Sequence, residues 1–409
     1  MIKGKRRKNM PRKFWLLILG AVVNATGSAF LWPLHTIYIH DYLGKSLSVA
    51  GMVIMLNSAA SVVGSLAGGA LYDKIGAFRT IVLGIAIDLL SLAGLTIWHG
   101  WPQYPFFLLF IGLGFGIVHP AMYAFAGELW KEGGRRAYNA LYVAINLGVA
   151  VGSALGGMIA SLSFDYIFVA NLLLFIVFSM MVVIGFRDAG GQGKAGGVRR
   201  QGPETGNDHK YFAALLILCF GYLLCCIAYS QWTTTIATYT QELRVSLKQY
   251  SLLWTINGLL IILGQPLLNL FIRAFMRTIK KQMVAGLVIF IASFYIASIS
   301  EHFYGFAAAM AVLTVGEMLV WPAIPTVADQ LAPKGKEGFY QGVVNSTNTG
   351  GRMIGPLLGG WLVDKFNMQV LFNVLMFLFV IAIVTSLTYD KGLKKGAVIR
   401  AKDAASMKD

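Results

Sequence analysis

The chain has 409 residues, of which 57% are hydrophobic and only 13% are charged. Soluble domains carry roughly 25% charged residues, so this composition excludes a soluble globular protein. Apolar runs recur from end to end, and about 20 apolar residues cross a bilayer core as one helix. A closed β-barrel would need alternating segments of about 10 residues, and no such segments recur here. We therefore expect an all-α membrane protein.

Twelve apolar runs are predicted to be transmembrane helices. Their expected bounds are 14–38, 48–72, 80–98, 105–129, 137–162, 166–186, 211–239, 249–272, 282–299, 304–331, 339–363 and 368–389. An even number of spans places both chain ends on one side of the membrane. The expected domains are a basic cytoplasmic N-terminus (1–13), a six-helix bundle (14–186), a cytoplasmic linker (187–210), a second six-helix bundle (211–389) and a cytoplasmic tail (390–409).

Lys and Arg residues predict the orientation. Of the 34 in the chain, 29 lie in the two ends, the linker and every second loop. The opposite loops hold only Lys45, Arg244, Lys248 and Lys365, and Arg352 lies inside a predicted helix. Basic loops stay in the cytoplasm, so both chain ends are predicted to be cytoplasmic and the protein to lie in the cell membrane. This distribution also explains the net charge of +16 without a nucleic-acid partner.

The linker is rich in glycine and basic residues and has no hydrophobic periodicity, which is typical of a flexible tether. Its Gly-Lys-Ala stretch lacks both the Ser/Thr and the preceding strand of a nucleotide-binding loop. The three cysteines, Cys219, Cys225 and Cys226, share one apolar run and are interpreted as buried apolar side chains. We expect no metal site and no cofactor.

The two bundles repeat each other in sequence. Pro120-Ala121 matches Pro322-Ala323 at an offset of 202, and a pattern of small residues matches at an offset of 203. The members of that pattern are Gly148, Gly152, Gly156 and Gly157 in the fifth run, and Gly351, Gly355, Pro356, Gly359 and Gly360 in the eleventh. Such residues let helices approach closely, and a proline can kink its helix. We expect them to form the surfaces on which the two halves move. A parallel six-plus-six repeat is typical of many secondary transporters.

A short charged stretch joins the second and third runs. Its glycines, acid and bases are Gly69, Asp73, Lys74, Gly76 and Arg79. With the twelve spans and the repeat, this pattern resembles the major facilitator superfamily. The glycines of the fifth run resemble the signature of its twelve-helix drug:proton antiporter branch. Trp32-Pro33, Asn257-Gly258, Gln265-Pro266 and Gly316-Glu317 resemble the LmrP-like multidrug transporters.

The chain departs from the pattern of that branch at several positions. Ala77 and Phe78 stand where the family usually has bases, and Ser153 stands where the antiporter signature has proline. The fourth run lacks the basic residue of the antiporters, and the first run has no acid. The proton-coupling residues of the family therefore cannot all be carried over to this chain.

Three charged residues lie near the middle of predicted helices and are candidates for proton coupling: Glu317, Arg352 and Asp88. An ionised carboxylate at that depth costs at least ~2.5 kcal/mol unless it is paired, hydrated or protonated. Glu317 can therefore bind and release a proton as its surroundings open and close, and the resemblance also implies a coupling role for it. Arg352 is always charged, and we expect it to pair with Glu317 or to recognise an anionic head group. Static structural roles stay open for all three residues, and for Asp88 that role is favoured.

Further residues are candidates for the switch and for the substrate cavity. Glu128 is expected to join Lys131 and Arg135 in a charge cluster that gates the inner side. A broad substrate site needs adaptable apolar and aromatic walls with few polar groups. The cavity candidates are Asn24, Trp32, His35, Tyr142, Asn146, Tyr229, Gln231, Asn257, Met318, Trp321 and Asn345. His119 is expected to be a packing residue.

The resemblance places Asp73 against the N-terminus of the eleventh helix, where a carboxylate gains ~0.3–1 kcal/mol, or up to ~2 when partly buried. It thus implies that Asp73, with its neighbours, is a conformational switch. The repeat puts Phe275 at the matching position of the second half, so we expect a one-sided latch.

The predicted function is secondary active transport, with proton-coupled export of hydrophobic or amphipathic compounds by a monomer. The proton gradient is the energy source. Alternatives on the same fold are a lipid or glycolipid flippase and an importer of a small solute. A membrane-embedded enzyme or receptor is disfavoured, because no metal-ligand cluster, nucleophile motif or large loop is present in the sequence.

Overall fold

The computed structural model describes residues 10–31, 35, 38–45, 47–160, 163–187, 208–276 and 278–393. The first half contains α1 (Arg12–Leu31), π-helix η2 (Tyr38–Tyr42), α3 (Leu47–Ile75), α4 (Ala77–Ile97), α5 (Gln103–Leu129), 3-10 helix η3 (Lys131–Gly133), α6 (Arg135–Ala160) and α7 (Phe164–Phe186). The second half contains α8 (Asp208–Ser230), 3-10 helix η5 (Gln231–Thr233), α9 (Thr235–Glu242), α10 (Leu247–Phe275), α11 (Ile279–Ser298), α12 (Phe303–Val320), α13 (Ala323–Leu331), α14 (Glu337–Lys365) and α15 (Met368–Thr388). The predicted N-terminus, linker and C-terminal tail lie largely outside the described residues.

The helices confirm the prediction of an all-α membrane protein. In the described ranges, 11 helical segments are long and apolar enough to cross a membrane. Helix α14 is more polar, but its 29 residues extend about 43 Å at 1.5 Å per residue, and it supplies the twelfth span. Polar side chains begin several of these helices: Ser246 and Gln249 form a capping box at α10, and Thr278 and Asn367 cap α11 and α15.

Two predicted continuous helices are broken in the structure. The seventh run divides into α8 and α9 at Gln231–Thr233, and the tenth divides into α12 and α13 at Trp321-Pro322. Proline has no N–H to donate and its ring clashes with the preceding turn, which explains the second break. At the first break, the Gln231 side chain donates to the Gly355 carbonyl of α14, at 2.7 Å. Helix α1 is described as far as Leu31, and part of the rest of the first predicted span lies outside the described residues.

The charged stretch between the second and third predicted spans forms no extended loop in the structure. Helix α3 continues through Asp73 and Lys74 to Ile75, and Gly76 alone separates it from α4. Gly76 has φ +83°, a left-handed conformation that glycine adopts without steric cost. Asp73 and Lys74 are therefore fixed on the last turn of α3, whereas Arg79 lies in the first turn of α4.

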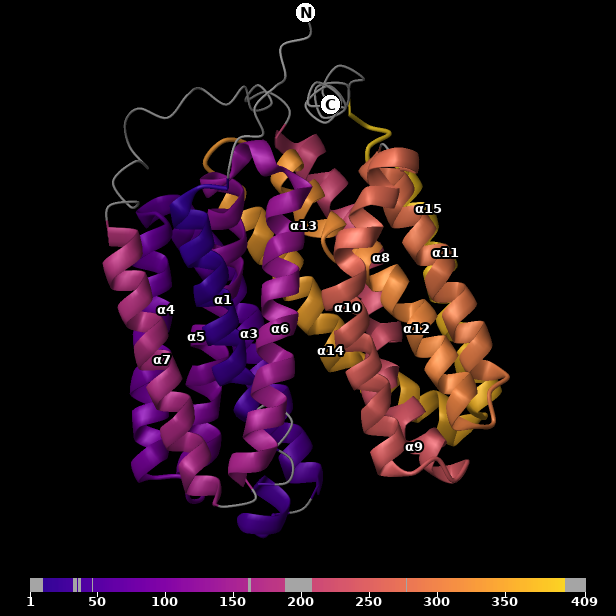
Figure 1. Cartoon of the computed structure of the whole chain (residues 1–409), viewed down its shortest axis with the longest axis horizontal. Coiled ribbons are helices and arrows are strands. Elements are labelled where there is room, and N and C mark those ends of the chain that lie inside the picture. The colour runs from indigo at the N-terminus through magenta and orange to yellow at the C-terminus, as the bar shows by residue number, and fades with distance from the viewer. Residues whose placement is uncertain are drawn as a thin grey trace, which may run out of the picture.

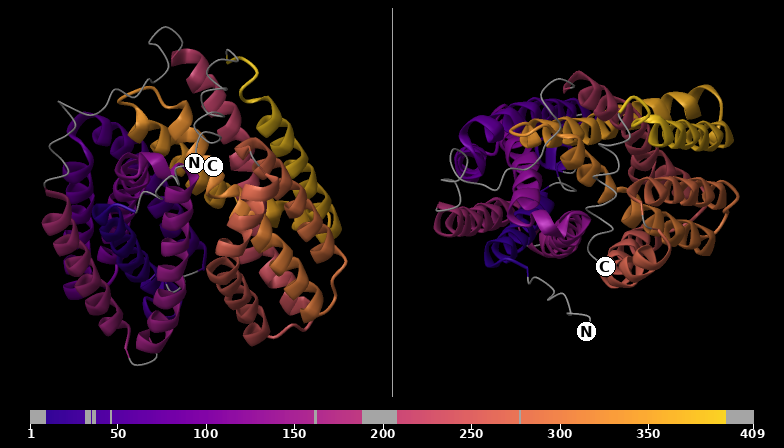
Figure 2. Two further views of the ribbon diagram at one scale, coloured as in Figure 1. Left: turned by 45° about the horizontal axis from the view of Figure 1, so that its top comes forward. Right: turned by 90° about the horizontal axis from the view of Figure 1, so that it is seen from above.

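The two halves lie side by side, with α1–α7 on the left of Figure 1 and α8–α15 on the right. They approach each other on the side where α1 begins and α15 ends, here called the terminal side, and their ribbons diverge toward the opposite side (Figure 1; Figure 2, left). Helix α3 contacts α14 across the boundary between the halves, and α6 contacts α10. The inter-half hydrogen bonds described below involve these helices together with α11 and α12.

Most of the signature glycines pack inside one half and not between the halves, and the surroundings of Gly157 lie outside what the structure describes. A Cβ at Gly148 or Gly152 would lie 2.5 and 2.3 Å from carbonyls of α1, and one at Gly351 would lie 2.4 Å from Cys226 of α8. For these glycines the expectation that they form the moving surfaces is wrong, because their close neighbours belong to the same half. A Cβ at Gly359 would likewise meet Gln231 of the same half, whereas nothing lies within 4 Å of a Cβ at Gly360.

Candidate functional site

Glu317 lies on α12 and is 2% exposed. Its Oε1 accepts a hydrogen bond of 3.0 Å from the Asn257 amide on α10, which also donates to the Thr314 hydroxyl at 2.9 Å. Its Oε2 accepts from the Tyr142 hydroxyl on α6 at 3.4 Å. Tyr229 of α8 lies within hydrogen-bonding reach of the same carboxyl group. We call Glu317, Asn257, Thr314, Tyr142 and Tyr229 the Glu317 site; donors from both halves of the molecule meet there.

Aromatic side chains surround the Glu317 site. The Trp321 ring makes T-shaped contacts with Tyr229 and Tyr222, at centroid distances of 5.5 and 5.6 Å. Trp254 contacts Tyr229 in the same way at 6.4 Å. Tyr229, Trp254 and Trp321 are only half-buried. Together they form a partly open aromatic wall beside a buried carboxyl group. Met318 is buried with Tyr142 and Ile261 in a small apolar cluster that joins the two halves.

Arg352 does not form the expected ion pair with Glu317. In the described part of the chain no contact of 4.0 Å or less joins a guanidinium nitrogen of Arg352 to the Glu317 carboxylate, although the two groups interact electrostatically. The Arg352 side chain is exposed, and its electrostatic neighbours include His119 on α5 and Tyr222 on α8. Because these neighbours belong to both halves, Arg352 points between the halves and not toward lipid. The amide of Asn257 satisfies Glu317 instead.

Asp73 lies at the end of α3 and binds the start of α14. Its Oδ1 accepts from the Gly338 N–H and its Oδ2 from the Phe339 N–H, both at 2.8 Å. These N–H groups belong to the first turn of α14, where they have no partner inside the helix. A carboxylate there also complements the positive end of the helix dipole. The contact crosses from the first half to the second.

The α3–α14 contact is close along the terminal side. A Cβ at Gly69 would lie 2.3 Å from the Gly338 carbonyl, and one at Gly342 would lie 2.4 Å from the Ser65 carbonyl. The Asn345 amide donates to the Ser65 hydroxyl at 2.6 Å. Asn345, a cavity candidate, is thus part of this contact, and the glycines on which the halves meet are Gly69, Gly338 and Gly342.

Arg135 makes a second inter-half contact that the sequence reasoning missed. From the start of α6 its Nη2 donates to the carbonyls of Met318 and Leu319, both at 3.1 Å, and its Nη1 donates to Gln282 of α11. Those carbonyls end α12, where a cation complements the negative end of the helix dipole. Asp73 and Arg135 both belong to the first half, so both charged side chains reach from that half to helix ends of the second. The one-sided latch expected from Phe275 therefore has two contacts, and it stays a prediction.

Neighbouring residues of α6 also contact the second half. Asn139 donates to Asn269 of α10 at 2.8 Å, and Tyr142 reaches Glu317. Arg135, Asn139 and Tyr142 recur at intervals of three to four residues, so they lie on one helix face. That spacing was the sequence signal that could have linked Arg135 to Glu317.

The expected charge cluster around Glu128 is not formed. Glu128 accepts a hydrogen bond of 2.6 Å from the Tyr72 hydroxyl of α3, and Arg135 is turned to the second half, where carbonyls need a donor. Lys74 and Arg79 are exposed and make no ion pair with any described residue. Of the switch candidates, Asp73 therefore bonds to the other half through its side chain, and the backbone of Gly69 packs closely against Gly338 of the other half.

Asp88 is separate from the Glu317 site. It lies on α4, is 2% exposed, and packs so closely on α5 that a Cβ at Gly114 would lie 2.2 Å from its Oδ1. This Oδ1 has no hydrogen-bond partner among the described residues. Helices α4 and α5 belong to the same half.

The remaining cavity candidates have other surroundings. Trp32 lies outside the described residues. His35 hydrogen-bonds the Tyr104 hydroxyl of α5 at 2.7 Å, and Asn146 donates to the Tyr142 carbonyl at 2.9 Å. Asn24 is buried on α1, and Gln231 belongs to the helix break. The structure thus brings Tyr142, Tyr229, Asn257, Met318 and Trp321 together with Glu317.

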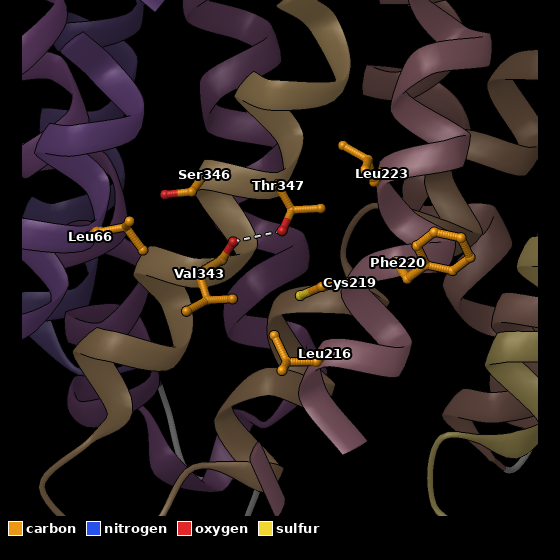
Figure 3. A pocket seen from close by; sticks show the side chains of 8 residues that line it. All are labelled: Leu66, Leu216, Cys219, Phe220, Leu223, Val343, Ser346 and Thr347. Atoms are coloured by element: carbon orange, nitrogen blue, oxygen red, sulfur yellow. Dashed lines mark hydrogen bonds between the residues drawn. The ribbon is translucent and has the colours of Figure 1, made fainter. Parts of the chain in front are cut away.

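A pocket of about 340 Å³ lies beside the α3–α14 contact (Figure 3). It is lined by Leu66 of α3, by Leu216, Cys219, Phe220 and Leu223 of α8, and by Val343, Ser346 and Thr347 of α14. Most of these lining residues are apolar. Thr347 is polar, but its hydroxyl donates to the Val343 carbonyl of its own helix at 2.8 Å. The pocket does not include the Glu317 site.

A family model described as Major Facilitator Superfamily matches residues 17–272 and 218–406. The chain belongs to the major facilitator superfamily. Its members are transporters and not enzymes, and they generally need no cofactor. Among the described residues no group of three or more His, Cys, Asp or Glu side chains could hold a metal ion.

Relatives within the superfamily cover nearly the whole chain. The chain is 56% identical over 385 residues to YttB of Bacillus subtilis (strain 168), named an uncharacterized MFS-type transporter, covering 94% of this chain and 97% of that one. It is 22% identical over 362 residues to the quinolone resistance protein NorA of Staphylococcus aureus (strain MSSA476), covering 87% and 91%. The crystal structure of a bacterial homologue of the iron transporter ferroportin has a TM-score of 0.75 at 15% identity, covering 93% and 100%.

Proposed function

We propose that this transporter is a proton-coupled exporter of hydrophobic and amphipathic compounds. It acts as a monomer in the cell membrane, with cytoplasmic chain ends, and moves small molecules by alternating access. The Glu317 site carries the proposal, because the buried carboxyl group of Glu317 accepts hydrogen bonds from both halves. Its protonation can therefore change how strongly the two halves are held together. The similarity to a quinolone resistance protein supports the choice of cargo.

The coupling step requires that protonation of Glu317 changes the stability of the inter-half contact. An ionised Glu317 accepts hydrogen bonds from Asn257 in its own half and from Tyr142 in the other. Protonation removes the charge that strengthens these bonds, since charge-assisted hydrogen bonds are roughly twice as strong as neutral ones. A proton on Glu317 therefore weakens the link between α6 and α12, next to the carbonyls that Arg135 binds.

The switch in this proposal consists of two helix-end contacts of opposite sign. Asp73 binds the N-terminus of α14, and Arg135 binds the C-terminus of α12. Each is worth about 0.3–2 kcal/mol through the helix dipole, which is enough to bias a two-state equilibrium and weak enough to break in every cycle. Together they hold the terminal side closed.

The direct test is a substrate panel in proteoliposomes with an imposed pH gradient. We expect dyes and drugs to be transported against their gradient and a protonophore to abolish this transport. If no pH gradient of either sign drives any compound, the proton-coupled proposal is refuted. Gradient-driven movement of lipids or of small polar solutes, without dyes, would favour the flippase or importer alternatives.

A further inference from the structure

We infer that the transported compound carries an anionic group, which Arg352 binds, and an aromatic or apolar body, which rests on the wall formed by Tyr229, Trp254 and Trp321. This inference rests on the proposed function and names its class of substrate. It concerns a carboxylate, sulfonate or phosphate group on an amphipathic molecule.

The first observation is the different exposure of the two charged groups. Glu317 is 2% exposed, and donors from α6 and α10 already occupy its oxygens. Arg352 is exposed, and among the described residues no hydrogen bond or ion pair holds its guanidinium group. A compound that enters between the halves therefore meets a positive charge, whereas the negative charge is covered.

The second observation is the chemistry of a free guanidinium group at this depth. Arginine stays charged, and its planar group of donors matches the oxygens of a carboxylate, sulfonate or phosphate. An arginine at mid-membrane is costly, so it faces a cavity or a partner and marks a substrate or ion path. With Glu317 satisfied by Asn257, an anionic ligand is the partner that Arg352 lacks.

The third observation is the aromatic surface near Arg352. Tyr222 is an electrostatic neighbour of Arg352. Its hydroxyl accepts a hydrogen bond of 2.8 Å from the amide of Asn348, which lies one helical turn before Arg352 on α14, and its ring contacts Trp321. Trp321 in turn contacts Tyr229, and Tyr229 contacts Trp254; all three side chains are half-buried. A positive donor at one end of an aromatic surface fits a molecule with an anionic head and a flat apolar body.

Export of such an anion is also favoured by the membrane potential. One charge crossing the membrane gains about 2.3 kcal/mol per 100 mV, and a cell interior is negative, so an anion is driven outward. A proton that moves inward on Glu317 adds to this drive. A cationic substrate would instead be exported against the potential.

The test compares two probes that differ by one charged group. 1-Anilinonaphthalene-8-sulfonate and N-phenyl-1-naphthylamine share a skeleton, and only the first has a sulfonate. Binding to the full chain in phosphatidylcholine nanodiscs is measured by energy transfer from tryptophan, after subtraction of empty discs. The wild type should bind the sulfonate more tightly than the neutral amine.

The variants assign the difference to one side chain. Arg352→Gln should weaken sulfonate binding about tenfold or more, the range of a charged hydrogen bond, and change neutral-probe binding by less than about twofold. Arg352→Lys should keep part of the affinity, and Arg187→Gln, which removes an equal charge at the end of α7, should change neither probe. Equal effects of Arg352→Gln on both probes, or a wild type that prefers the neutral probe, would overturn the inference.

Two further arms separate the possible sources of the anion and the two proposals. If phosphatidylglycerol in the discs competes with the sulfonate in the wild type but not in Arg352→Gln, the anion site stands and its occupant is a lipid head group. Sulfonate binding without any pH-driven transport would keep the anion site and refute the exporter. Transport of neutral or cationic dyes without sulfonate binding would keep the exporter and refute the anion site.

Discussion

Tyr142 on α6 donates a hydrogen bond of 3.4 Å to Glu317 on α12, and this bond joins the first half of the transporter to a buried carboxyl group of the second. Two turns earlier on α6, Arg135 binds the carbonyls of Met318 and Leu319, which directly follow Glu317. The proposed proton site and the closing contact on the terminal side therefore share one pair of helices. We therefore expect a change at either place to affect the other.

Glu317→Gln should abolish proton-driven efflux while the protein still folds and exchanges substrate down its gradient. Glutamine keeps the shape and can bond to Asn257, but it cannot bind or release a proton. The measurement is dye efflux in inverted vesicles, with and without a protonophore, beside counterflow without a gradient. Unchanged gradient-driven transport would remove Glu317 from the mechanism.

Asp88→Asn is the matched control for Glu317→Gln. Both carboxyl groups are 2% exposed, but Asp88 packs on Gly114 inside one half and does not reach the inter-half contact. The Oδ1 of Asp88 has no hydrogen-bond partner among the described residues, and asparagine keeps the shape of the side chain, so it is a close substitute. We expect gradient-driven efflux to remain within about twofold of wild type, which is the usual size of an effect below ~0.5 kcal/mol. A loss as complete as that of Glu317→Gln would assign proton coupling to Asp88 as well.

Asp73→Asn should open the terminal side. The amide keeps one acceptor for the N–H groups of Gly338 and Phe339 but loses the negative charge, at a cost of ~0.3–2 kcal/mol. Such a cost changes the ratio of closed to open states several-fold. Spin labels at the exposed positions Lys131 and Lys334, one in each half, measure it as a longer distance, in a chain whose three cysteines are replaced by alanine. An unchanged distance distribution would argue that Asp73 only stabilises the fold of α3.

Arg135→Gln should open the same side by at least as much. It removes charge-assisted bonds to two helix-end carbonyls, and hydrogen bonds to charged groups contribute about 1.5–3 kcal/mol. Arg135→Lys keeps the charge without the fork of donors, and it should show an intermediate distance with the same labels. If the two arginine variants behave alike, the bonds to Met318 and Leu319 do not set the closed state.

Gly342→Ala should prevent close approach of α3 and α14. Its new Cβ would lie 2.4 Å from the Ser65 carbonyl, and overpacking of this kind costs about 1–3 kcal/mol. Gly360→Ala is the control on the same helix, because nothing lies within 4 Å of its Cβ. We expect a longer label distance and slower transport for the first variant and wild-type values for the second. Equal behaviour of the two variants would show that close packing at Gly342 is dispensable.

The sequence by itself determined the class of the protein, the membrane spans and the two-fold repeat. Transmembrane helices are local, since each must satisfy its own backbone in lipid, and their length and apolarity are written in consecutive residues. Glu317 and Arg352 could be found in the same way, because a charge in the middle of an apolar run stands out. The breaks at Gln231 and Trp321-Pro322 are less visible in the sequence. The first involves a hydrogen bond to a distant helix, and the second depends on a proline, which can also remain inside a helix, as Pro120 and Pro266 do.

Only the tertiary structure decided which of these residues meet. Glu317 bonds to Asn257 and Tyr142 and not to Arg352, because helix rotation and tilt, which no local pattern records, set the side chains that face each other. The same holds for Arg135, which in the sequence is one basic residue among many, because only the packing of α6 on α12 brings it to the carbonyls of Met318 and Leu319. Helix ends offer unpaired N–H and carbonyl groups wherever they fall, and only the packing of the two halves shows which charge reaches which end.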